Sequence, residues 1–141
     1  MNATIEKFGF PATLVREYEH WLVLLRPAQV TLGALVLAAK SDATAFGELP
    51  GPAFAELAGV VPAIEKALAA FARCERINYL MLMMVDRQVH FHVVPRYSGS
   101  REWGGVEFPD QGWPGSPDLK AAIALSPQQI SSLRDELATY F

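Results

Sequence analysis

Hydrophobic positions along this chain change their spacing from one segment to the next, and the spacing predicts the order of the elements. Short apolar segments at Glu19–Leu25 and Thr31–Ala39 have the length and composition of strands. Pro27 ends the first, because proline cannot donate to a sheet ladder. Gly33 in the second allows a bend or a close approach of the backbone. This part of the chain therefore predicts two strands.

The spacing becomes helical after Gly51-Pro52, where a proline in the first turn suits the start of a helix. Apolar residues then recur three and four positions apart, which predicts one stripe facing the core: Phe54, Leu57, Val61, Ile64, Leu68 and Phe71. Pro62 lies inside this stripe and should kink or split the helix. A second helix is predicted from Ser126, because Gln129 three residues later completes a capping box. Its buried face would hold Ile130, Leu133 and Leu137.

The apolar segment Arg76–Val85, between these helices, predicts a strand that could be buried on both faces. Asp86-Arg87 is the expected turn into the next strand, which would make an antiparallel hairpin. Two registers remain open: a turn of two residues brings Met81 and Met83 to the face of the following histidines, and one of three residues brings Asn78 and Leu82 there.

Polar and apolar residues alternate with period two from Gln88 to Arg96. Alternate side chains of a strand leave opposite faces, so Gln88, His90 and His92 should share the face opposite to Phe91. The chain has three histidines, and two of them lie here. A neutral imidazole can act as a nucleophile, as an acid or base, or as a metal ligand.

Composition narrows the partners that such a site could have. Apolar residues make up 51% of the 141 residues and charged residues 19%, as in a globular protein. A net charge of −3 argues against nonspecific nucleic-acid binding, which needs a basic surface. Cys74 is the only cysteine, and Met1–Phe10 lacks the apolar core of a signal peptide. We expect a cytoplasmic protein without a membrane partner, because its longest apolar run, Leu32–Ala39, is too short to span a bilayer.

The string Gln88-Val89-His90-Phe91-His92-Val93-Val94-Pro95-Arg96 resembles the signature of the histidine triad family of nucleotide hydrolases and transferases. That signature reads His-x-His-x-His, then two apolar residues and often Pro-Arg. The segment Thr31–Leu37 is similar to an earlier strand of the family, which usually reads Pro-Gly-His-x-Leu-Val. The resemblance implies one α+β domain over residues 1–141, with an antiparallel sheet of about five strands and helices packed on one side. It also implies a homodimer whose substrate is a dinucleoside polyphosphate or a nucleoside phosphoramidate.

By this resemblance, His90 is the nucleophile that attacks an α-phosphorus and forms a nucleotidyl-histidine intermediate. His92 and Gln88, at the third and first triad positions, would stabilise the charge that develops on the phosphate oxygens. Gln88 replaces a histidine, so it can donate a hydrogen bond but cannot act as a general acid. The family's Gly-Gln loop also has no room in the short Asp86-Arg87 turn. The scheme requires no metal and no cofactor.

Four further residues are candidates for nucleotide or phosphate binding. Arg26 lies near the usual position of a ribose-binding asparagine, and Asn78 would face the site in one of the two registers. Arg96 could hold phosphate, or form a salt bridge at the strand end. Trp103, in the Gly-, Pro- and Trp-rich segment Tyr97–Pro117, could stack on a base, as could Trp113; anchoring of the loop or a dimer contact is the alternative for both. This segment should be irregular, with a short strand near Gly105–Phe108.

Two other functions are compatible with the histidine pair. A metal site could use His90 and His92 as two ligands, but no further histidine or glutamate follows at short spacing. A nucleotide-binding or regulatory protein could keep the fold without the chemistry, and Gln88 in place of histidine favours that alternative.

Overall fold

A computed structural model describes all residues from Met1 to Phe141. Its centre is a five-stranded antiparallel sheet with the strand order β1-β2-β4-β6-β5. The strands are β1 (Leu14–Glu17), β2 (Trp21–Leu25), β4 (Leu35–Ala39), β6 (His90–Arg96) and β5 (Arg76–Leu80). The predicted α+β class and the five-stranded antiparallel sheet are therefore confirmed.

Strands β2 and β4 form the middle of the sheet because every one of their residues is buried. Successive residues of these strands belong in turn to one or the other of two hydrophobic clusters, one on each face of the sheet. Trp21, Val23 and Leu25 of β2 belong to the larger cluster, while Leu22 and Leu24 belong to the smaller one on the opposite face. The sheet is thus covered on both faces.

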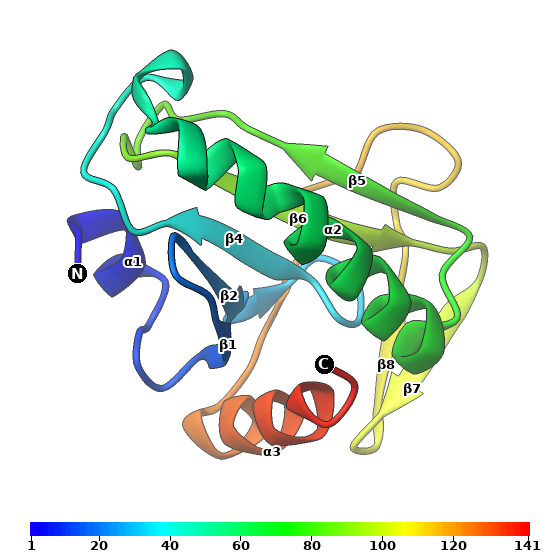
Figure 1. The fold of residues 1–141 in the computed structure, drawn as a ribbon. Helices are drawn as coiled ribbons and strands as arrows, with labels where there is room; N and C mark the ends of the chain where they lie inside the picture. Colours follow the sequence, from blue (N-terminus) through cyan, green and yellow to red (C-terminus); the bar gives the residue numbers. More distant parts are fainter.

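The two long helices, α2 (Gly51–Ala72) and α3 (Pro127–Ala138), contribute to the larger cluster, as predicted for helices on one side. Figure 1 shows α2 lying across this face of the sheet. Ile64 and Leu68 of the predicted stripe are fully buried, whereas Phe54 is 39% exposed and packs against Phe46 of the short 3-10 helix η1 (Phe46–Glu48). Pro62 does not split α2, which runs unbroken through this residue with the proline on its exposed side.

The predicted capping box of α3 is present. The Ser126 hydroxyl accepts from the Gln129 backbone N–H, and the Gln129 side chain accepts from the Ser126 N–H. Leu133 and Leu137 are buried, and Ile130 is half-buried beside them. The box therefore fixes the start of the helix that packs against β1.

A five-residue helix that the hydrophobic pattern does not reveal, α1 (Ala3–Lys7), covers the other face of the sheet. Its Asn2 side chain caps the helix by accepting from the Ile5 N–H and also donates to the carbonyls of Ala39 and Ser41. Ile5 and Phe8 pack on the alternate residues of β2 and β4 that point to this face. The smaller cluster thus places α1 beside the strand that carries the two histidines.

Two predicted strands are shorter than expected. The strand from Thr31 begins only at Leu35, because Gly33 adopts a φ of +95° and turns the backbone close to Leu68. The strand from Arg76 ends at Leu80 and lies at the sheet edge, so it is not buried on both faces. Residues 81–89 form a loop instead of the predicted short turn. Leu80 pairs with His92 and Asn78 with Val94, so Asn78 lies on the histidine face, as in the second of the two predicted registers.

The remaining strands are short. The Gly-rich segment holds a hairpin of β7 (Ser100–Trp103) and β8 (Val106–Pro109), which includes the predicted strand near Phe108 and a second strand that was not predicted. Strand β3 (Ala28–Gln29) pairs with β9 (Ile123–Ala124), which draws the start of α3 back to the sheet. No helix of the structure has the length and apolarity needed to cross a membrane.

Candidate functional site

A cavity of about 420 Å³ opens on the sheet face that α1 covers. One wall comes from α1 and the residue after it, the floor from β6 and the end of β2, and the opposite wall from the loop after β5. The lining residues are Lys7, Phe8, Arg26, Leu82, Met83, Met84, Val85, Asp86, His90, His92 and Leu119. Three of the residues singled out in the sequence, Arg26, His90 and His92, therefore meet in one cavity.

The His90 ring is held in a defined orientation by the backbone. Its Nδ1 lies 2.8 Å from the carbonyl oxygen of Gln88. A carbonyl can only accept, so Nδ1 carries the proton and Nε2 keeps its lone pair in the neutral ring. The residue is 1% exposed and lines the cavity. These contacts give His90 the tautomer of a nucleophile or base that acts through Nε2.

His92 lies beside His90 on the same face of β6, with the ring centroids 5.1 Å apart. Burial, the neighbouring His90 and the charge of Arg26 lower the pKa of His92 to about 4. His92 is therefore neutral at physiological pH, and its Nδ1 is buried without a hydrogen-bond partner. The cavity thus holds a neutral imidazole next to the candidate nucleophile.

Lys7 and Phe8, at the end of the first helix, form the cavity wall beside the two imidazoles. The Phe8 ring lies 5.6 Å from His90 and 5.7 Å from His92, measured between centroids. Lys7 Nζ lies 2.7 Å from Asp86 Oδ1, which joins α1 to the loop of residues 81–89 across the cavity. An aromatic ring and an ammonium group that the sequence did not indicate therefore line the site beside the histidines.

Arg26 follows β2 on the face of the histidines, two residues after Leu24 of the smaller cluster. One guanidinium nitrogen, Nη1, donates to the carbonyl of Ala28, while the buried Nε has no partner. Burial lowers the pKa of Arg26. Arg26 therefore lies in the histidine cavity, and its predicted role in nucleotide or phosphate binding stays a prediction.

Gln88 does not line the cavity. It precedes β6 rather than belonging to it, and its side-chain oxygen accepts from the Thr4 hydroxyl of α1 at 2.5 Å. Only its backbone carbonyl contacts a catalytic candidate, through His90 Nδ1. The residue at the first triad position therefore orients a ring and anchors α1, in contrast to the predicted contact with phosphate oxygens.

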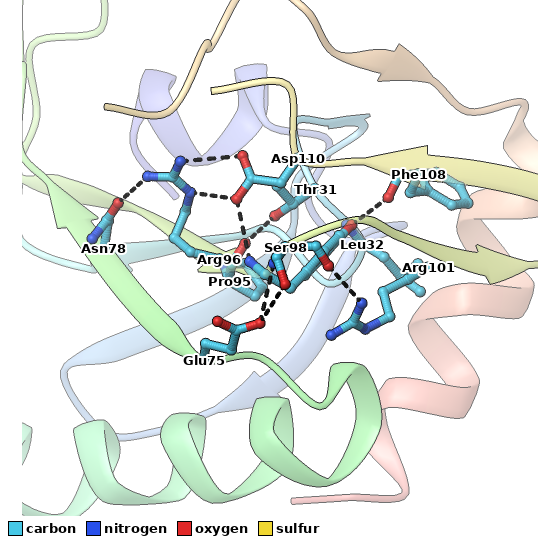
Figure 2. A network of polar contacts seen from close by, with 11 residues as sticks. Thr31, Leu32, Glu75, Asn78, Pro95, Arg96, Ser98, Arg101, Phe108 and Asp110 are labelled. Carbon is cyan, nitrogen blue, oxygen red and sulfur yellow. Dashed lines mark hydrogen bonds and ion pairs between the residues drawn. The ribbon is translucent and has the colours of Figure 1, made fainter. Parts of the chain in front are cut away.

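Arg96 and Asn78 lie outside this cavity, and Figure 2 shows what holds them. The Arg96 guanidinium binds both Asp110 oxygens, with Nε at 2.7 Å and Nη2 at 3.1 Å, and donates from Nη1 to Asn78 Oδ1. The side chains of Arg96 and Asp110 are 5% and 2% exposed. A buried, two-pronged ion pair leaves Arg96 few free donors, so it fixes the strand end to the loop after β8. The salt-bridge alternative for Arg96 is the one the structure shows.

The two tryptophans of the Gly-rich segment are also remote from the histidines. Trp103 ends β7 and donates from its indole nitrogen to Glu136 of α3. It therefore anchors the β7–β8 hairpin to α3 and does not lie where it could stack on a base in the histidine cavity. Trp113 lines a separate depression together with Asn78 and Arg96. Neither residue contributes to the cavity of His90.

The donor set does not suit a metal ion. No three His, Cys, Asp or Glu side chains gather closely enough in the structure to hold one. The histidine pair is accompanied instead by cationic and apolar residues, Lys7, Arg26 and Phe8. These residues suit an anionic ligand that has an apolar part.

The site contains residues that sequence reasoning missed. Lys7 and Phe8 belong to a helix too short to show a periodic pattern, and Leu119 comes from an irregular segment. The apolar residues at positions 82–85 were visible as a strand-like run, but they line the cavity from a loop. In the structure, their exposure distinguishes them from the residues of a buried strand: Met84 and Val85 are 83% and 82% exposed.

No protein-family model matches the sequence, and the curated proteins contain no significant match. Solved structures do match. A histidine triad protein from Sinorhizobium meliloti superposes with a TM-score of 0.76 at 19% identity, over 100% of this chain and 96% of that one. A histidine triad protein from Bradyrhizobium japonicum gives 0.70 at 17% identity, over 99% and 96%. A hypothetical histidine triad nucleotide-binding protein from Sulfolobus tokodaii gives 0.68 at 19% identity, over 97% and 88%. The chain therefore has the histidine triad fold.

Proposed function

We propose that this chain, which has the histidine triad fold, is a nucleotide hydrolase or nucleotidyl transferase that acts at an α-phosphate through His90. One observation carries the proposal. The Gln88 carbonyl fixes the proton of His90 on Nδ1 and leaves Nε2 as the free nitrogen of a ring that lines a cavity. A neutral nucleophile suits an anionic phosphate, because it is not repelled by the charge on the phosphate oxygens.

The reaction would proceed in two displacements. His90 Nε2 donates its lone pair to the α-phosphorus, a P–N bond forms, and the bond to the leaving group breaks with its electron pair. The imidazolium that results keeps its Nδ1 proton, and the Gln88 carbonyl stabilises it by accepting that hydrogen bond. Water, or a second nucleophile, then attacks the phosphorus and loses its proton to solvent. The P–N bond breaks and its electron pair returns to Nε2, which leaves His90 as the neutral ring.

Cavity composition supports a nucleotide as the substrate. Leu82, Met83, Val85 and Phe8 provide apolar surface for a base, and Arg26 provides positive charge for phosphate. The substrate classes that fit are dinucleoside polyphosphates and nucleoside phosphoramidates. The proposed compartment is the cytoplasm.

The first test is turnover of an adenosine phosphoramidate and of two diadenosine polyphosphates. We expect His90→Ala to reduce turnover by at least about a thousandfold while the protein stays folded, because a covalent pathway needs its nucleophile. His20→Ala is the matched control, since His20 lies outside the cavity. Equal turnover by wild type and His90→Ala would contradict the proposed mechanism.

A second candidate, a nucleotide-binding protein without chemistry, is favoured by one contact. The Gln88 side chain is bound to Thr4 and offers no proton to a leaving group. Binding of adenosine monophosphate without any turnover of the panel would favour this function over the enzyme.

We also propose a homodimer. Strand β5 is an edge of the sheet and leaves one row of backbone N–H and C=O groups unpaired, whereas α3 packs against β1 at the other edge. Pairing of two β5 strands would satisfy those groups and join two sheets into one.

A further inference from the structure

We propose that Lys7 is a phosphate-binding residue of this site, and that Asp86 holds its ammonium group in place until the anionic substrate displaces the carboxylate. This inference rests on the proposed nucleotide function and concerns a residue outside the triad segment. Lys7 would provide a charged contact at a site where the Gln88 side chain provides none.

The helix directs Lys7 toward the cavity. Residues three and four apart lie on one side of a helix, so Thr4, Lys7 and Phe8 share a face. Thr4 binds the Gln88 side chain, and Phe8 packs against both imidazoles. Both flanking contacts point this face at the histidines, and Lys7 between them lines the cavity.

Two cations line the cavity, Arg26 and Lys7, and Lys7 is the more exposed of the two. Arg26 is held by the Ala28 carbonyl and is partly buried, whereas the Lys7 side chain is 53% exposed. His92 provides no fixed charge opposite to phosphate, since its lowered pKa keeps that ring neutral. Asp86 is the one carboxylate in the lining.

The Lys7–Asp86 pair is suited to exchange rather than to stability. Lys7 Nζ lies 2.7 and 2.9 Å from the two Asp86 oxygens. An ion pair with an exposed partner contributes little to stability, because water screens it. A phosphate placed beside His90 would repel Asp86 and attract Lys7, so the ammonium would move from the carboxylate to the phosphate.

A purely structural ion pair makes a different prediction. If the pair only fastened α1 to the loop of residues 81–89, loss of either partner would loosen the cavity in the same way. If Lys7 binds phosphate, the two losses have opposite effects. Removal of Lys7 removes a contact, and removal of the Asp86 charge removes a competitor and a source of repulsion.

The test is calorimetric binding of adenosine monophosphate and of adenosine to Lys7→Met, Lys7→Arg, Asp86→Asn and wild type. We expect Lys7→Met to weaken binding of the monophosphate by about tenfold and to leave adenosine unchanged, because the lost contact is charge-assisted. Asp86→Asn should tighten binding of the monophosphate by a few fold, and Lys7→Arg should retain it. Lys40→Met, which breaks an ion pair with Glu17 away from the cavity, is the control and should change neither constant.

Three outcomes would overturn the inference. Equal affinity of wild type and Lys7→Met for the monophosphate would exclude a phosphate contact. Weaker binding by both Lys7→Met and Asp86→Asn, for both ligands, would show a fastening role. A wild type that binds neither ligand would overturn it together with the nucleotide function. Absence of turnover alone bears on the His90 mechanism, since these measurements require no chemistry.

Discussion

At the scale of single residues, backbone and helix contacts determine what each imidazole can do. His90 is given its tautomer by a backbone carbonyl, and His92 is kept neutral by burial and by positive neighbours. The alternation of the sequence predicted correctly that both rings share one face, opposite to Phe91. It could not predict Gln88, because the strand begins two residues later and the glutamine side chain turns to Thr4.

The neutral state of His92 predicts a pH-dependent stability. Its pKa is about 4 in the folded chain, against 6.5 for an ordinary histidine. The unfolded chain therefore binds a proton between these values that the folded chain does not, so stability falls as pH falls from about 6.5 to about 4. The loss from this residue should be of the order of 2–3 kcal/mol.

Urea unfolding at pH 7.5, 5.5 and 4.5 measures this effect. The asparagine variant His92→Asn should lose less stability across the range than wild type, because it has no proton to gain. His20→Asn, outside the cavity, provides the comparison. The same decline in wild type and His92→Asn would show that other groups determine the acid sensitivity.

At the scale of elements, hydrophobic periodicity predicted the strands and helices that face the core. It placed β2 and α3 well, because a proline follows the first and a capping box starts the second, and it located β6 from the alternation with period two. It failed for the segment at residues 82–85, where apolar side chains line a cavity instead of forming a strand. It also failed for α1, which is held by contacts to residues more than 30 positions away.

Pro62 offers a test at this scale. It lies in the interior of α2, exposed to solvent, and cannot donate the hydrogen bond that Ala58 would accept. We expect Pro62→Ala to raise the free energy of unfolding by about 1–2 kcal/mol, as a helix interior gains a bond and loses a clash. Thermal unfolding would show a higher midpoint. Pro52→Ala is the matched control, because proline in the first turn sacrifices no bond. An unchanged or lower midpoint for Pro62→Ala would mean that α2 is bent around this residue in a way that its neighbours require.

At the scale of the whole molecule, the sheet order leaves β5 as an edge and places the cavity on the face away from α2 and α3. The sequence predicted five antiparallel strands through its resemblance to the histidine triad family. It could not predict that the cavity is built from both ends of the chain, since irregular segments and short helices carry no periodic signal.

The proposed dimer is measured at this scale. Sedimentation equilibrium at micromolar concentration should give twice the chain mass of 15.5 kDa, because the open edge of β5 can pair with a second copy. A mass of one chain at all concentrations would contradict the proposal.

The cavity walls come from distant parts of the chain: Lys7, Arg26, residues 82–86, the two histidines of β6, and Leu119. Ligand binding therefore depends on the integrity of the entire chain. A partly unfolded molecule lacks at least one wall, so only the native state can hold a ligand. Any compound that binds the cavity must therefore raise the midpoint of thermal unfolding. At a ligand concentration a hundred times the dissociation constant, the free energy of unfolding rises by about 2.7 kcal/mol. A library of nucleotides can accordingly be screened by melting curves alone, before any reaction is known.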